Sequence, residues 1–148
     1  MRVFLLIGAL LSLSLLSACE PEQGCTDSKS VNYNPNAEED DGSCEYEANA
    51  VFWMDPVTAL MLQQNYISLV RIYIDDSFIG SMVSNSTLES APECWEAGVS
   101  MSADLGSDKT KDVSLKITYP HPYIEEEIVY YEGSFRLEGG ECKAFRIQ

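Results

Sequence analysis

Five cysteines carry the most specific chemistry in this chain of 148 residues. Cys19 follows an apolar run, Val3–Leu16, which the basic Arg2 precedes. A basic start, an apolar run and small residues before a cleavage point are typical of a secretory signal. The apolar run has 14 residues, whereas a membrane-spanning helix needs ~20. The sequence therefore predicts an exported protein whose signal peptide, residues 1–18, ends just before Cys19.

The four residues that end at this cysteine, Leu16-Ser17-Ala18-Cys19, resemble the lipobox of bacterial lipoproteins. The resemblance implies that Cys19 is the lipidation site: diacylglycerol is attached to its sulfur, the chain is cut before it, and the new amine is acylated, for example with palmitate. Several acyl chains, at ~0.8 kcal/mol per buried methylene, hold a protein on a membrane. The resemblance predicts a bacterial envelope lipoprotein anchored to the cell outer membrane by its N-terminal lipid, on the surface or periplasmic face. An ordinary cleaved signal and an uncleaved anchor are the alternatives.

Four cysteines remain once Cys19 is lipidated: Cys25, Cys44, Cys94 and Cys142. Export places them in an oxidising compartment, where they allow three disulfide pairings. Pairing of neighbours, 25 with 44 and 94 with 142, fits a chain of two segments, and loop length makes such bridges worth about 3 and about 4 kcal/mol. Metal–thiolate binding is the alternative, but the chain has no Cys-x-x-Cys motif and a single histidine.

The segment between the anchor and residue 48 is strongly acidic. Residues 20–47 hold nine acids and one lysine, in a chain of net charge −15. Turn-forming residues dominate it and few side chains are apolar, so it needs a disulfide to fold. The segment resembles a short cysteine-bounded repeat of surface and secreted proteins from marine bacteria of the Bacteroidetes type. The repeat reads Gly-Cys-Thr-Asp, Asn-Tyr, Ala and Asp-Asp-Gly-Ser-Cys, and these marks stand here at 24–27, 32–33, 37 and 40–44. The resemblance implies a stalk or spacer.

The oxygen-rich side chains of this segment could bind a cation. An EF-hand register fails, because Ala37 stands where glycine is required and Ser43 where a bidentate glutamate is required. A different calcium site, built from Asp27, Asp40, Asp41 and backbone carbonyls, would suit millimolar extracellular calcium. The other interpretation is a solvated acidic loop that keeps the spacer extended. The sequence leaves both interpretations open and indicates no other cofactor.

Side chains suited to catalysis are sparse. The single histidine, His121, lies between two prolines, which is typical of a rigid turn rather than of a Ser-His-Asp triad. The chain has no nucleophile elbow, phosphate loop or dinucleotide fingerprint. The glutamates at 125–127 could serve a glycosidase, but a charged strand edge is the simpler interpretation. We therefore expect a protein that is not an enzyme, and its acidity argues against nucleic acid as a partner.

Beyond residue 48 the chain shows the period-two alternation of half-buried strands. In the clearest case, Val113–Tyr119, apolar residues take one face and Ser114, Lys116 and Thr118 the other. A second segment is expected to bulge at Gly133. The predicted strands contain residues 51–53, 70–74, 78–79, 99–105, 113–119, 129–137 and 145–147.

These segments predict a mainly β fold, an antiparallel β-sandwich of about seven strands. Asp55 as a cap and Pro56 at the first helical position predict one short helix over 55–64. The sandwich domain is expected to span 48–148. It follows a signal helix over 1–18 and a disulfide-stapled, irregular acidic segment over 19–47.

Residues 70–80 resemble the opening hairpin of PEGA-like and carboxypeptidase-regulatory-like domains, which are small sandwiches of the bacterial envelope. An aromatic strand ends in Asp75, and the return strand ends in Gly80; Asp76 stands where the family has glycine. The sequences around Cys94 and Cys142 resemble the paired cysteines of small lipoprotein sandwiches. The resemblance implies a non-catalytic adaptor or spacer.

The function that these observations predict is that of a membrane-anchored envelope lipoprotein, a non-catalytic binding or interaction module at the cell surface. Its partner would be a protein or a glycan. The alternative is a structural accessory of an envelope assembly with no ligand of its own. An exposed cluster of Trp95 with tyrosines would favour binding, because aromatic rings stack on sugars and anchor interfaces, although most aromatics of a small sandwich are core residues. An exposed hydrophobic sheet edge without an aromatic platform would favour the structural accessory. The aromatic candidates are Trp53, Trp95, Tyr123, Tyr130 and Tyr131.

Overall fold

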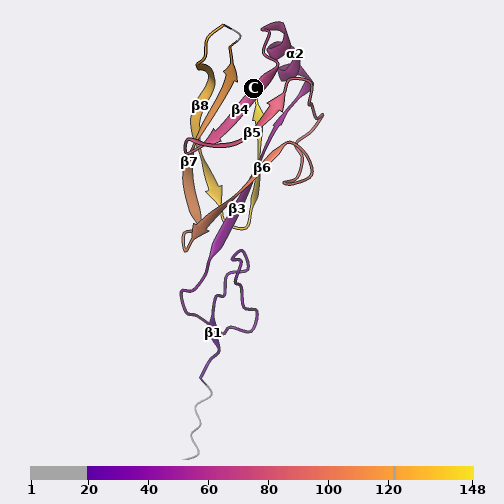
Figure 1. The fold of residues 1–148 in the computed structure, drawn as a ribbon. Coiled ribbons are helices and arrows are strands. Elements are labelled where there is room, and N and C mark those ends of the chain that lie inside the picture. Colours follow the sequence, from indigo (N-terminus) through magenta and orange to yellow (C-terminus); the bar gives the residue numbers. More distant parts are fainter. Residues whose placement is uncertain (1–19, 122) are drawn as a thin grey trace, which may run out of the picture.

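The computed structural model describes residues 20–121 and 123–148. The predicted signal peptide and the predicted lipidation site, Cys19, lie outside these residues. Within the described part, no helix is both long enough and apolar enough to cross a membrane. The acidic segment lies at one end of the molecule, and a β-sandwich extends away from it (Figure 1).

Seven strands form the two sheets of the sandwich, which confirms the predicted mainly β fold. The three-stranded sheet has the order β6 (Val99–Gly106), β3 (Tyr46–Met54) and β9 (Cys142–Ile147). The four-stranded sheet has the order β5 (Ser77–Val83), β4 (Leu69–Ile74), β7 (Thr110–Pro120) and β8 (Glu127–Glu138). Neighbouring strands are antiparallel except β3 and β9, which run parallel. The first and last strands of the sandwich therefore lie side by side, and β3 begins two residues before the predicted domain start.

The core lies between the two sheets and is centred on Phe52. Its ring lies 5.6 Å from that of Phe145 and 6.2 Å from that of Phe135. The C-terminal half of β3 is also buried on the face that points away from the four-stranded sheet, where Val51 and Trp53 lie. The loop over 84–98 covers this outer face: a Cβ added to Gly98 would lie 2.3 Å from the carbonyl oxygen of Phe52. This double burial explains the continuous apolar run in β3.

The bulge in β8 lies at Tyr130, so the prediction of a bulge at Gly133 is wrong. Ile117 pairs with Tyr131 and Thr118 with Val129, which leaves Tyr130 as the extra residue. Gly133 has a different role. A Cβ at this position would lie 2.5 Å from the hydroxyl of Tyr131, so the missing side chain provides space for that ring.

The predicted hairpin and the predicted helix are both confirmed. Asp75 and Asp76 join β4 to β5, and both have positive φ, as a two-residue type I′ turn requires. Helix α2 (Pro56–Gln64) begins after Asp55, whose carboxylate accepts a hydrogen bond of 2.7 Å from the backbone N–H of Thr58. This cap satisfies one of the free donors at the helix start.

Both predicted disulfides, Cys25–Cys44 and Cys94–Cys142, are present. The first closes the acidic segment, in which the short strands β1 (Gln23–Gly24) and β2 (Glu39–Asp40) pair in parallel. The second joins the 84–98 loop to the start of β9. Each disulfide therefore stabilises a part of the chain that has little regular secondary structure: the acidic segment in one case and the 84–98 loop in the other.

The acidic segment is docked onto the base of the sandwich. Asp27 accepts hydrogen bonds from the ammonium of Lys109, at 2.6 Å, and from the hydroxyl of Tyr46, at 2.9 Å. Lys29 forms an ion pair of 2.5 Å with Glu141 in the β8–β9 turn. These contacts fix the segment against the ends of several strands.

Candidate binding surface at the end opposite the acidic segment

Helix α2 and the β7–β8 connection lie at the same end of the sandwich, far from the acidic segment (Figure 1). Large apolar side chains that are more than half exposed gather on these two elements. We call them the distal surface: Val57, Leu60, Met61, Tyr66, Tyr123 and Ile124. Large exposed apolar patches mark interaction sites, and a hollow that Met61 and Val129 both line connects the helix to the hairpin.

Helix α2 is apolar on its outward side as well as on its inward side. Ala59 and Leu62 are buried in the core, whereas Val57, Leu60 and Met61 face solvent. These three apolar side chains, beside the exposed Gln63 and Gln64, are not covered by any other part of residues 20–121 and 123–148.

Tyr66 occupies an unusual backbone position just after α2. Its N–H donates to the carbonyl of Gln63, and the N–H of Ile67 donates to the carbonyl of Leu62, which together form a Schellman cap. The residue at this place in the cap has positive φ, here 60°, and is usually glycine. Tyr66 is 96% exposed, so within the described residues its ring has almost no packing contacts. Trp95, with a φ of 70° and 64% exposure, shares this combination of a left-handed backbone and an exposed ring.

A hollow of about 400 Å³ lies between α2 and the β7–β8 hairpin. Met61 and Val129 form its exposed walls, and burial raises the pKa of the Tyr130 phenol in its lining. The complete lining is Met61, Leu62, Asn65, Ile67, Tyr119, Val129 and Tyr130. The hollow extends the distal surface inward, between the helix and the hairpin.

The charge distribution of the distal surface differs from that of the rest of the chain. No charged residue occurs from Pro56 to Val70, although the chain carries a net charge of −15. The exposed Glu125 and Glu126 border the surface on the hairpin side. The surface thus has a neutral, apolar centre and an acidic edge, which complement a partner with an apolar patch beside basic residues.

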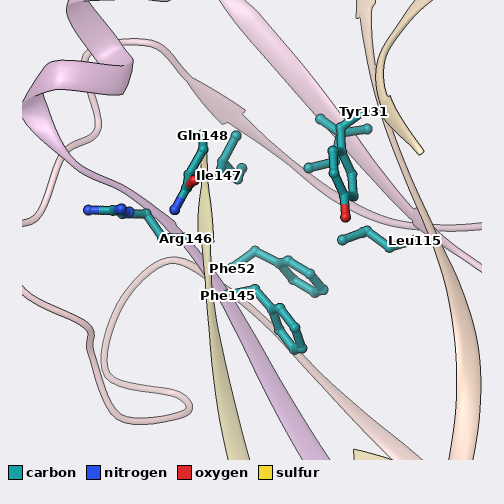
Figure 2. A pocket seen from close by; sticks show the side chains of 8 residues that line it. Phe52, Leu115, Tyr131, Phe145, Arg146, Ile147 and Gln148 are labelled. Atoms are coloured by element: carbon teal, nitrogen blue, oxygen red, sulfur yellow. The ribbon is translucent and has the colours of Figure 1, made fainter. Parts of the chain in front are cut away.

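A second hollow opens between the two sheets on the side where β8 and β9 are the edge strands. We call it the slot. It has a volume of about 170 Å³, and the rings of Phe52, Tyr131 and Phe145 converge on it (Figure 2). Arg146 and Gln148 lie at its polar end (Figure 2). Arg146 also bonds Asp55 at 3.0 Å, which ties β9 to the start of α2.

The five aromatic residues considered as one stacking platform are distributed over the molecule. Trp53 is buried in β3, and Trp95 is 64% exposed in the loop between β5 and β6. Tyr123 belongs to the distal surface, whereas Tyr130 and Tyr131 line the two separate hollows. The sequence analysis did not identify Leu60, Met61 and Tyr66 as surface candidates. The absence of charged residues after Asp55 could have indicated them.

The glutamates at 125–127 do not converge on one point. Glu125 and Glu126 lie in the hairpin connection, whereas Glu127 accepts hydrogen bonds from Arg71, Tyr73 and Thr118. The Thr118 hydroxyl and then the Arg71 guanidinium hold the pKa of Glu127 below its usual value. This carboxylate cross-links three strands. His121 lies in the same connection, with its ring 5.8 Å from that of Tyr123.

The three carboxylates considered for calcium have hydrogen-bond donors of their own. Asp27 accepts from Lys109 and Tyr46, Asp40 from the N–H of Gly42 and Asp41 from the N–H of Ser43. Within residues 20–121 and 123–148, no three His, Cys, Asp or Glu side chains are grouped as metal ligands. A calcium ion at Asp27 would have to compete with the ammonium of Lys109. Calcium binding by this segment stays a prediction.

Docking of the acidic segment is expected to weaken at low pH. Lys109, then the backbone of Lys29 and the hydroxyl of Tyr46, hold the pKa of Asp27 far below its usual value. A carboxylate with a lowered folded-state pKa stabilises the docked state above its unfolded pKa of ~3.9, and this contribution is lost as the pH falls further. The protection of the amides of residues 24–45, taken relative to the intrinsic exchange rate at each pH, should therefore fall below about pH 4. The Asp27→Asn variant should lose part of this pH dependence, and an unchanged dependence would contradict the assignment to Asp27.

Comparison of the chain with protein-family models, with curated proteins and with solved structures found no match. The fold and the surface together define a β-sandwich with two disulfides, a docked acidic segment and an apolar distal surface.

Proposed function

We propose that this protein is a lipid-anchored lipoprotein of the bacterial outer membrane, and that its sandwich is a non-catalytic interaction module. The distal surface binds a partner protein. Cys19, the proposed lipid attachment site, precedes the acidic segment, whose strand β1 lies at the end of the molecule opposite helix α2 (Figure 1). A tether at that end presents the distal surface away from the membrane, at the cell surface or in the periplasm.

One observation carries this proposal: Tyr66 is almost fully exposed at a backbone position that favours glycine. The surrounding helix face carries no charge, and the hollow beside it combines apolar side chains with the polar groups of Asn65 and two tyrosines. Protein interfaces are enriched in tyrosine and methionine at their centres and depleted of charge there. The exposed apolar side chains of α2 favour a protein as the partner, because large apolar residues are enriched at the centres of protein interfaces.

Replacing Tyr66 with glycine should stabilise the fold and weaken binding. Relief of the left-handed conformation should raise the free energy of unfolding by about 1 kcal/mol. Loss of an exposed aromatic anchor should reduce partner capture about tenfold. Capture is measured in cells by photocrosslinking from a benzophenone amino acid at Leu60, and stability by thermal unfolding of the purified chain. A higher free energy of unfolding together with weaker partner capture would show that Tyr66 acts in binding and not in folding.

The matched control is Phe78→Ala, which removes an exposed aromatic ring from β5 outside the distal surface and should leave capture unchanged. A Cys19→Ser variant should move the protein from the membrane fraction to the soluble fraction. If Leu60 captures no protein in cells with the anchored chain, the distal surface is not the binding site. The structural accessory without a ligand is then the better account.

A further inference from the structure

One sheet of the sandwich has four strands and the other has three. The three-stranded sheet lacks a strand on the side where β8 and β9 are the edge strands. On the closed side, β5 and β6 approach each other because residue 80 is glycine. A Cβ at this position would lie 2.7 Å from a methyl carbon of Val99. On the other side, β8 is the edge of the four-stranded sheet and β9 the edge of the three-stranded sheet. Within the described residues, β9 pairs only with β3, so its outer edge is free.

The inner face of the sandwich is incompletely covered beside this free edge. Tyr131 on β8 is 47% exposed, and Phe135 and Phe145 are only partly buried. The slot lies beneath Tyr131, between β8 and the end of β9 (Figure 2). Its volume of about 170 Å³ is similar to that of an apolar cavity of ~150 Å³ that binds benzene. A fourth strand beside β9 would cover this face, and one aromatic ring would fill the slot.

We propose that an extended, acidic segment of a partner protein adds to the free edge of β9 and inserts an aromatic side chain into the slot. This site is separate from the distal surface. In strand addition, main-chain hydrogen bonds supply affinity, and pockets for alternate side chains supply specificity. The edge and the slot offer these two elements side by side.

The charged side chains of β9 indicate which kind of partner segment would bind there. Lys143, on β9, has no carboxylate partner within residues 20–121 and 123–148, and its ammonium donates to the carbonyl of Arg136 on β8 at 3.0 Å. Arg146 lies at the polar end of the slot. The charge of Arg146 is already paired with Asp55, so Lys143 is the cation that favours an acidic residue in the added strand, in a chain of net charge −15. A lysine on an edge also disfavours pairing with a second copy.

The test replaces the partner's strand with an extension at the C-terminus of the full chain. An Asn-Gly turn and the strand Thr-Val-Glu-Phe-Thr-Glu-Thr are appended after Gln148. A two-residue hairpin turn places the phenylalanine opposite Phe145, on the inner face, and the two glutamates opposite Arg146 and Lys143. Matched controls replace the appended phenylalanine with alanine, or the glutamate opposite Lys143 with lysine.

The phenylalanine strand should raise the Tm by about 5 °C over the alanine strand and slow exchange of the edge-facing β9 amides about tenfold. The lysine control should lose part of this gain. Equal Tm values for the phenylalanine and alanine strands would overturn strand addition at the slot, and an unaffected lysine control would overturn the acidic partner. Light scattering of the unextended chain is the second measurement. A dimer that the appended strand dissolves would make the occupant a second copy and overturn a separate partner.

Discussion

Removing the disulfide between Cys25 and Cys44 should unfold the acidic segment and leave the sandwich intact. The two cysteines are 19 residues apart, so the double variant Cys25→Ser/Cys44→Ser should lose about 3 kcal/mol of local stability. The segment otherwise relies on hydrogen bonds, among them those of Asn32 with Ser43 and Glu45, and on the two-residue pairing of β1 with β2. Both cysteines are buried at its centre, and its other contacts with the sandwich are mainly polar ones at Asp27 and Lys29.

Amide hydrogen exchange measures this loss directly, because it reports each segment separately. Residues 24–45 should exchange at rates near those of an unfolded chain, whereas strands β3–β9 should keep their protection. The control is Cys94→Ser/Cys142→Ser, which should loosen the 84–98 loop and leave the acidic segment protected. Full protection of residues 24–45 in the first variant would show that Asp27 and Lys29 suffice to hold the segment.

Most of the sandwich could be predicted because its strands have one buried face. Val113–Tyr119 alternates strictly, and it became a central strand whose apolar residues face the core. The disulfide pairing followed from the division of the chain into two segments. Helix α2 was predictable from Asp55 and Pro56, because capping is decided by local residues.

The parallel pairing of β3 with β9 could not be predicted, because alternation describes each strand alone and carries no information on its neighbours. The bulge is a similar case. Gly133 suggested one by its residue type, but the extra residue is Tyr130, and the glycine instead makes room for Tyr131. Strand register depends on side chains from several elements at once.

The distal surface was missed because its residues appear ordinary in the sequence. Leu60 and Met61 fit a core helix, and only the packing shows that they face solvent. Tyr66 follows the helix at a position whose φ the sequence does not reveal. The absence of charge from Pro56 to Val70 was a readable signal, since helices at protein surfaces usually carry charged residues on the outward face.

Replacing Phe52 with alanine should destabilise the sandwich more than any exposed substitution. The side chain is fully buried between the sheets and packs against Phe135 and Phe145. Phenylalanine-to-alanine changes in cores cost about 3–5 kcal/mol, and the new cavity would join the slot. The urea midpoint should fall with an unchanged m-value, and the Tm should fall by roughly 15 °C. Phe78→Ala removes the same group from a site that is 57% exposed and should cost under about 1 kcal/mol. Similar losses for the two variants would mean that Phe52 does not join the sheets.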